Sequence, residues 1–198
     1  MAAPKPIPIE SHALDNLRYI RDTMERAASF TAVPGWGGVL IGASALAAAG
    51  IASHSHSPGQ WLATWMVEAI AAILVGSFAL WHKASAANVS LVSAPARKFA
   101  LGFIPPLVVG AILTLVLFQM NALAVIPGLW LMLYGIGVVA GGAFSVPVVP
   151  VMGGCFLIAG AALALIQPSL AAADFWLGAC FGGLHVIFGA IIAKRYGG

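Results

Sequence analysis

The sequence predicts an all-α polytopic membrane protein, with six transmembrane helices preceded by one cytoplasmic amphipathic helix. Of the 198 residues, 61% are hydrophobic and 8% are charged, whereas a soluble domain carries about 25% charged residues. The mean hydropathy is +1.00. Several apolar runs approach the roughly 20 residues that cross a hydrocarbon core about 30 Å thick. Together these observations exclude an ordinary water-soluble domain and predict contact with a lipid bilayer.

Two regions are expected along the chain. Residues 1–33 form a cytoplasmic N-terminal segment, with an amphipathic helix over about residues 11–30. Residues 34–198 form the transmembrane domain. Its predicted spans are 34–53, 61–81, 100–119, 123–143, 148–166 and 175–193.

The N-terminal helix is predicted from an apolar stripe in which Leu14, Leu17 and Ile20 recur at three-residue spacing. Ser11 is a suitable N-cap. The polar face carries both signs of charge, including the i,i+4 pairs Arg21–Glu25 and Asp22–Arg26. A helix that binds anionic lipid is usually rich in Lys and Arg. The mixed charge therefore favours contact with protein, either a second copy or another membrane or cytoplasmic protein; a plain interfacial helix is the alternative.

The basic residues predict the orientation. With six spans, all Lys and Arg fall on one side: in the N-terminal segment, between spans two and three, and at the C-terminus. By the positive-inside rule both termini are cytoplasmic, and we expect an integral protein of a bacterial inner membrane. Trp61, Trp65 and Trp176 are expected in an outer aromatic belt. No basic stripe indicates nucleic-acid binding.

Prolines and glycines mark predicted interruptions. Pro147 and Pro150 separate spans four and five, and Pro105 with Pro106 predicts a helix break inside span three. Spans one and four open alike, with a proline followed eight residues later by a glycine: Pro34 and Gly42, then Pro127 and Gly135. This similarity indicates a candidate 3+3 inverted repeat, an arrangement that many transporters use.

Two ionisable side chains are expected deep in the membrane. Glu68 lies about 10–12 Å from the outer end of span two, and His185 about 15 Å from that of span six, at 1.5 Å per residue. Such groups usually face a bundle interior or a water-filled cavity. If spans two and six are neighbours, the two side chains are placed to share a hydrogen bond and relay a proton. The alternative is that each only fixes helix packing.

Other chemistries find less support in the sequence. Haem bound between two histidines has no depth-matched pair, so no cofactor is predicted, and a single-ligand haem at His185 is kept only as an alternative. The candidates for a metal site are His54, His56 and Asp174, fewer than the usual ligand set, and no metal is predicted. No catalytic motif is present, neither a GxSxG elbow nor an HExxH helix.

Six spans in about 200 residues with both termini inside resembles the substrate-binding S-components of energy-coupling-factor transporters. The small-residue face of their first helix has counterparts in Ala43/Ala47 and Ala45/Ala49. The resemblance concerns architecture and implies solute binding. The sequence therefore leads to two hypotheses: a small transporter or channel-like protein with proton coupling through Glu68 and His185, or a non-catalytic membrane subunit that docks a partner through residues 11–30.

Overall fold

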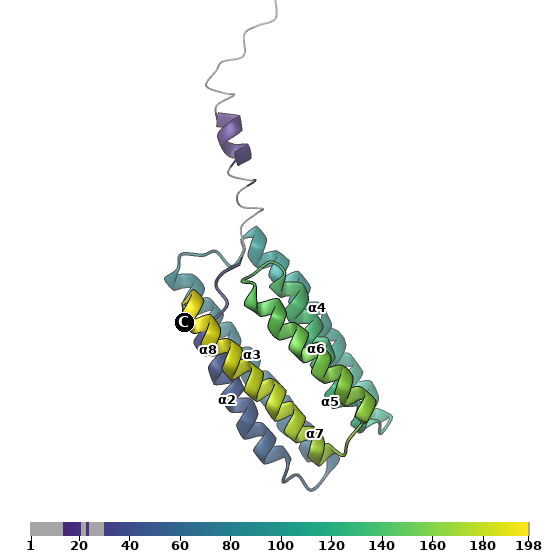
Figure 1. Ribbon diagram of the computed structural model, residues 1–198. Helices are drawn as coiled ribbons and strands as arrows, with labels where there is room; N and C mark the ends of the chain where they lie inside the picture. Colours follow the sequence, from purple (N-terminus) through teal and green to yellow (C-terminus); the bar gives the residue numbers. More distant parts are fainter. Residues whose placement is uncertain (1–13, 21–22, 24–29, 198) are drawn as a thin grey trace, which may run out of the picture.

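The computed structural model describes residues 14–20, 23 and 30–197, and within them six helices are long and apolar enough to cross a membrane (Figure 1). The prediction of an all-α fold with six membrane-length spans is confirmed. The first five spans are α2 (Gly35–Ala52), α3 (Pro58–Ala86), α4 (Ala94–Gln119), the 3₁₀ turn η1 (Leu123–Val125) with α5 (Ile126–Gly142), and α6 (Val148–Ile166). The sixth is α7 (Leu170–Leu177), the π-helical η2 (Gly178–Leu184) and α8 (His185–Tyr196).

Several helices extend beyond the predicted apolar ranges because serine caps, not the ends of the apolar runs, set their first residues. Ser57 precedes α3 and accepts a hydrogen bond from the Gln60 amide, and Ser169 precedes α7 and accepts one from the Ala172 amide. Apolar composition indicates which part of a helix lies in the hydrocarbon core, whereas the capping residue determines where the helix begins. One consequence is that Asp174 lies inside the sixth span and not in a loop.

The helices form two groups of three (Figure 1). In the first half, α2 packs between α3 and the sixth span; in the second half, α5 packs between α4 and α6. The chain enters the second half through residues 87–93 and returns through residues 167–169. The second half is therefore an insertion between spans two and six.

Glycines allow very close packing inside each half. In the second half, a Cβ added to Gly153 would lie 2.7 Å from the Val139 backbone nitrogen. In the first half, a Cβ on Gly42 would lie 2.6 Å from the Gly182 carbonyl oxygen. For each described glycine, the nearest atoms within 4 Å of its Cβ position belong to that glycine's own half. Close backbone approach of this kind is how helices associate in lipid.

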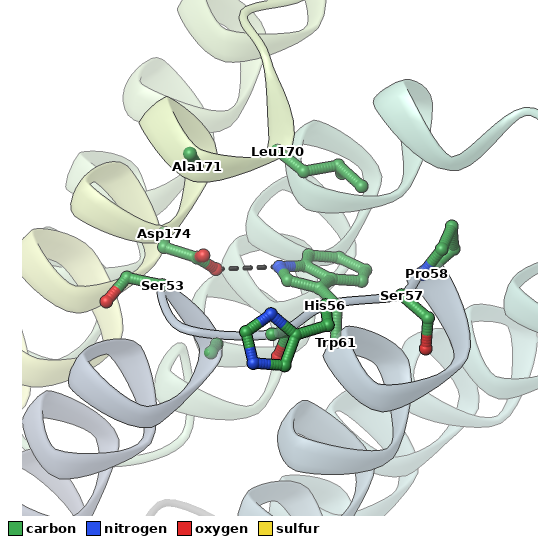
Figure 2. Close-up of a pocket in the computed structure, with 10 residues that line it drawn as sticks. Ser53, His56, Ser57, Pro58, Trp61, Leu170, Ala171 and Asp174 are labelled. Carbon is green, nitrogen blue, oxygen red and sulfur yellow. Dashed lines mark hydrogen bonds between the residues drawn. The ribbon is translucent and has the colours of Figure 1, made fainter.

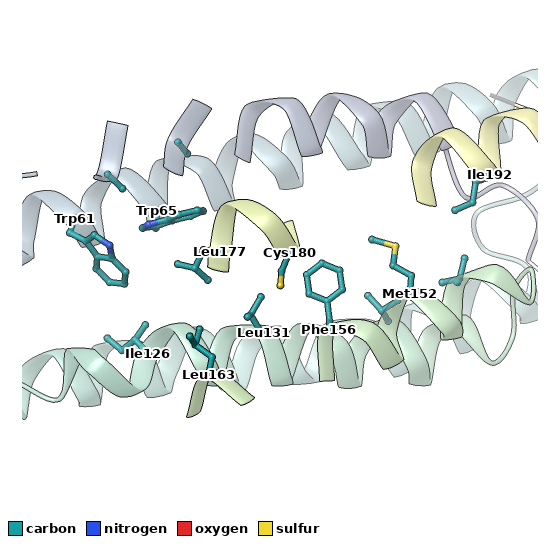
Figure 3. Packing of buried hydrophobic residues seen from close by; sticks show 14 of the residues in the cluster. Trp61, Trp65, Ile126, Leu131, Met152, Phe156, Leu163, Leu177, Cys180 and Ile192 are labelled. Carbon is teal, nitrogen blue, oxygen red and sulfur yellow. The ribbon is translucent and has the colours of Figure 1, made fainter. Parts of the chain in front are cut away.

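Large side chains, not glycines, fill the space between the halves (Figure 3). Trp61, Leu177 and Cys180 of the first half face residues of the second half such as Leu131 and Phe156, and all are buried. The two halves are thus each tightly joined through backbone contacts, and they meet through an apolar layer of side chains.

The segment before α2 joins both halves at one end of the bundle. The Phe30 amide donates to the Phe144 carbonyl (2.7 Å), and the Ser145 hydroxyl donates to the Phe30 carbonyl (2.7 Å). Lys83 Nζ donates to the Val33 carbonyl (2.9 Å) and to the carbonyls of the last described residues, including Tyr196 at 3.1 Å. The start of the first span and the end of the sixth therefore lie at the same end, here called the terminal end.

Lys83→Met is expected to loosen the terminal end. The substitution removes the charged donor that bonds both the Val33 carbonyl before the first span and the Tyr196 carbonyl at the end of the sixth. Hydrogen bonds to charged groups are worth about 1.5–3 kcal/mol, less at a partly exposed site such as this one. Hydrogen exchange should speed up in the last turn of α8. Lys194→Met, at an exposed position on α8, is the control; equal exchange in both variants would contradict the assignment.

Residues 14–20 are helical, as expected, and Asp15 and Arg18 form an exposed ion pair at 3.8 Å. The apolar residues Leu14, Leu17 and Ile20 are exposed. Thr23 is also helical, whereas Phe30 is not. The other residues of the predicted helix lie outside the described residues, including Ser11 and the Arg21–Glu25 and Asp22–Arg26 pairs.

Candidate binding and proton-transfer site

Glu68 lies on α3, half-buried against α2. Its Oε1 is 2.9 Å from the Ser44 hydroxyl, which is also 2.9 Å from the Ile41 carbonyl oxygen. A hydroxyl has only one hydrogen. The single hydrogen of Ser44 therefore serves one of these two acceptors at a time. The Ser44–Glu68 hydrogen bond joins α2 to α3.

His185 lies at the first position of α8 and is 6% exposed. Its Nδ1 is 2.7 Å from the Phe181 carbonyl oxygen, and its Nε2 is 2.6 Å from the Tyr134 hydroxyl. A carbonyl only accepts, so Nδ1 carries the hydrogen. In the neutral ring Nε2 is then the acceptor of the Tyr134 proton. Both ring nitrogens are therefore engaged in hydrogen bonds.

The Tyr134–His185 hydrogen bond crosses between the two halves, since Tyr134 is on α5. Aromatic rings surround it: the Phe156 ring centroid lies 4.8 Å from that of Tyr134 and 5.5 Å from that of His185. Phe181 packs 5.3 Å from the Tyr134 ring. The Tyr134–His185 pair is therefore enclosed in the apolar layer on which the halves meet.

The π-helical segment Gly178–Leu184 ends directly before His185. Short π-helical turns inside α-helices are rare and are frequent at functional sites. Gly178 and Gly182 pack against Ala49 and Leu46 of α2, so the irregular segment is held by the first half while His185 reaches Tyr134 of the second. The wide turn thus helps to set where the imidazole lies.

The structure does not bring Glu68 and His185 together. Glu68 is bonded to Ser44, His185 to Tyr134 and Phe181. The sixth span and α3 each pack on α2, and hydrogen bonds join spans two and six at both ends of the bundle. Lys83 donates to the Tyr196 carbonyl at the terminal end, and Trp61 and Trp65 donate to Asp174 at the opposite end.

Asp174 on α7 is 2% exposed and joins spans two and six. Its Oδ1 accepts a hydrogen bond from the indole nitrogen of Trp61 at 2.7 Å (Figure 2). The same oxygen accepts a second one from the indole nitrogen of Trp65 at 3.0 Å. The i,i+4 spacing of the two tryptophans places both indoles on one face of α3. The Trp61 ring stacks on Trp130 of the second half, with centroids 5.7 Å apart.

A pocket of about 200 Å³ opens beside Asp174, at the end of the bundle opposite the termini (Figure 2). The segment between α2 and α3 supplies much of its wall. Its lining residues are Ala52, Ser53, Ser55, His56, Ser57, Pro58, Trp61, Leu170, Ala171 and Asp174.

The interpretation of Trp61 and Trp65 as belt residues was wrong, because both are buried, at 2% and 3% exposure. Composition cannot separate a tryptophan that faces lipid from one that faces a neighbouring helix. Asp174 was assigned to a loop because the predicted span began at residue 175. Tyr134 was overlooked, although it is the one tyrosine within the apolar spans.

The remaining predicted residues lie as follows. His54 Nδ1 is 2.8 Å from the Gly50 carbonyl oxygen, while His56 lines the pocket with Asp174. Among the residues that the structure describes, no three His, Cys, Asp or Glu side chains are grouped as a metal site. Helix α4 continues through Pro105 and Pro106 instead of breaking there. Such prolines are tolerated in membrane helices where neighbouring helices support the backbone.

Pro147 and Pro150 lie at the start of α6. Pro147 is the N-cap residue, and Pro150 falls in the first turn, where the missing amide has no intrahelical acceptor to lose. The α5–α6 turn therefore lies where the sequence placed it.

Asp174→Ala is expected to destabilise the fold by about 1–3 kcal/mol for each indole N–H left without an acceptor. Asp174→Asn keeps an oxygen at the acceptor position and should cost much less. Thermal unfolding in mild detergent, followed by tryptophan emission, compares the two. Equal losses in the two variants would contradict the role of Oδ1.

The described part of the chain thus places two hydrogen-bonded ionisable side chains within the bundle, Glu68 with Ser44 and His185 with Tyr134, and one carboxylate at a pocket, Asp174. Glu68 lies within the first half, and the Tyr134–His185 pair lies between the halves. Asp174 lies at the end of the bundle opposite the terminal end. No family model, curated protein or solved structure matches this chain.

Proposed function

We propose that the protein is a small-solute transporter of the membrane in which proton binding at the Tyr134–His185 pair is coupled to movement of the two halves. The observation that carries this proposal is the contrast in packing. Close backbone contacts lie within each half, whereas the halves meet through side chains that enclose one polar pair. Alternating access requires two rigid groups of helices that can move against each other at the interface between them.

The hydrogen-bond arrangement supports proton coupling. In the neutral state Tyr134 donates to His185 Nε2. A proton arriving at Nε2 turns this nitrogen into a donor, so the Tyr134 hydroxyl must accept and direct its own hydrogen elsewhere. The imidazolium would also lie among phenylalanine rings, where an unpaired charge is costly. Protonation therefore disfavours the described arrangement and favours one in which the halves admit water.

Helix adjacency supports the candidate 3+3 inverted repeat. Exchanging spans one, two and six for spans four, five and three maps each half onto the other, with α2 and α5 both central. The glycine contacts count against it: Gly42 packs on the sixth span and Gly135 on α6, which are not equivalent helices under this exchange. The repeat is proposed on arrangement alone.

The proposed orientation follows from charge. Lys83 and the C-terminus share the terminal end, and all basic residues belong to segments on that side, so by the positive-inside rule this end is cytoplasmic. The Asp174 pocket then faces the opposite side. A bacterial inner membrane is the proposed location.

Proteoliposomes containing the pH dye pyranine test the proposal. A panel of amines, sugars and amino acids is added outside, and internal pH is recorded. We expect a solute-dependent pH change with the wild-type protein, its loss in His185→Gln and a weaker effect of Glu68→Gln. The absence of any solute-dependent change with correctly folded protein would contradict transport.

A second candidate, a docking subunit, is favoured by the N-terminal segment. Leu14, Leu17 and Ile20 are exposed, while residues 30–33 are anchored on both halves. A partner, or a second copy, held by the helix would thus be connected to the whole bundle. Purification from native membranes with and without residues 1–29 tests this: a partner lost on truncation supports docking, and a particle of unchanged composition contradicts it.

A further inference from the structure

We infer that the pocket beside Asp174 binds a small organic cation through its ammonium group. This inference names the substrate class for the proposed transporter and rests on that function for its biological use. The binding itself is a property of the pocket and is tested without transport.

The first step concerns the free oxygen of Asp174. Oδ1 accepts both indole N–H groups, whereas Oδ2 accepts no hydrogen bond from the described residues. No buried side-chain oxygen in that part of the chain lacks a partner. Oδ2 is therefore not sealed off, and Asp174 lines the pocket. The tryptophans fix the carboxylate and leave one oxygen for a ligand.

The second step concerns charge. Among the residues that the structure describes, no Lys or Arg lines the pocket, and the sequence places the lysines and arginines in the segments assigned to the terminal end. Within the described residues the carboxylate forms no salt bridge. Its charge is thus balanced by two neutral donors only, and a cation entering the pocket supplies the missing partner.

The third step concerns the type of cation. An ammonium group has three donors: Oδ2 can accept one, and the Ser55 hydroxyl and the His56 ring in the same lining offer further acceptors. The Trp61 ring also lines the pocket, and indole rings attract cations. A transition metal usually needs three or four protein ligands, and His56 with Asp174 supplies two. The volume, about that of seven water molecules at roughly 30 Å³ each, suits a short organic chain.

Two probes of equal size isolate the charge: 5-aminopentan-1-ol and 1,5-pentanediol, which differ only in an ammonium in place of a hydroxyl. Binding to the full-length protein in mild detergent is measured by calorimetry and tryptophan emission. We expect the amine to bind and the diol to bind at least about tenfold more weakly, since hydrogen bonds to charged groups are the stronger ones.

Asp174→Asn removes the charge while keeping an acceptor for the indoles, and it should weaken amine binding by about tenfold or more. Asp15→Asn removes a carboxylate far along the chain, on the N-terminal helix, and should leave binding unchanged. Equal binding of the two probes, unchanged amine binding in Asp174→Asn, or binding of Zn²⁺ without binding of the amine would each overturn the inference.

The same measurements separate this inference from the proposed function. Asp174-dependent amine binding without solute flux in liposomes would leave the site standing and contradict transport. Solute flux that Asp174→Asn does not alter, with no amine binding, would leave transport standing and overturn the site.

Discussion

Gly153→Ala is expected to destabilise the protein by about 1–3 kcal/mol, the usual cost of forcing extra volume into a packed interface. The added methyl would lie 2.7 Å from the Val139 nitrogen and 2.9 Å from the Gly135 carbonyl oxygen. Both are backbone atoms of α5, so no side-chain rotation relieves the contact. Helices α5 and α6 must move apart, which also removes the reciprocal approach of Gly135 to Leu157.

Gly154→Ala is the matched control, one residue further along the same helix. A Cβ at Gly154 meets nothing within 4 Å, and alanine is favoured over glycine in a helix by about 1 kcal/mol. This variant should be neutral or slightly more stable. Thermal unfolding of both variants in the same detergent measures the difference; a Gly153→Ala protein as stable as Gly154→Ala would contradict the close packing described for the second half.

Tyr134→Phe is expected to abolish solute-dependent proton movement and to destabilise the protein by about 1–3 kcal/mol. The substitution keeps the ring among Phe103, Phe156 and Phe181 but removes the hydroxyl that is hydrogen-bonded to His185 Nε2. A buried acceptor left without its donor costs about this much. Without the Tyr134 hydroxyl, no hydrogen bond from His185 Nε2 reaches α5, so protonation of the imidazole no longer changes a contact with the second half.

A double-mutant cycle with His185→Gln separates the pair from its surroundings. If the two side chains act through their shared hydrogen bond, the stability losses of the single variants should not add, with a coupling of about 0.5–3 kcal/mol. Additive losses, together with normal proton movement in Tyr134→Phe, would show that the pair serves packing alone. Glu68→Gln, which changes the carboxyl group bonded to Ser44, is the comparison for flux.

The existence of six spans could be predicted because each span needs a long apolar run, and composition reports such runs directly. Which spans are neighbours could not be predicted in the same way. The pairing of spans one and six depends on where glycines such as Gly35, Gly42 and Gly189 permit backbone contact, and this chain has glycines in all six spans. Small residues indicate that a helix packs closely without indicating against which helix.

The candidate site was predictable in part for the same reason. Glu68 and His185 stand out because ionisable groups in a span are costly, but their partners Ser44 and Tyr134 are ordinary residues until the fold places them nearby. Asp174 was set aside because apolar composition placed the start of span six after it. Trp61 and Trp65 lie at i and i+4 and so share one face of a helix. This spacing is the one sequence feature consistent with their shared acceptor, Asp174.

The central claim is that the two halves move against each other as bodies. Spin labels test it most directly, placed at exposed positions on a Cys155→Ser, Cys180→Ser background: Ile51 with Leu165 across the halves, and Met120 with Leu165 within the second half. Distances are measured by pulsed electron resonance in liposomes at pH 5 and pH 8. The account predicts that the cross-half distance distribution shifts or splits between the two pH values while the within-half distribution stays unchanged. A cross-half distribution that is identical at both pH values, or a within-half one that changes equally, would contradict it.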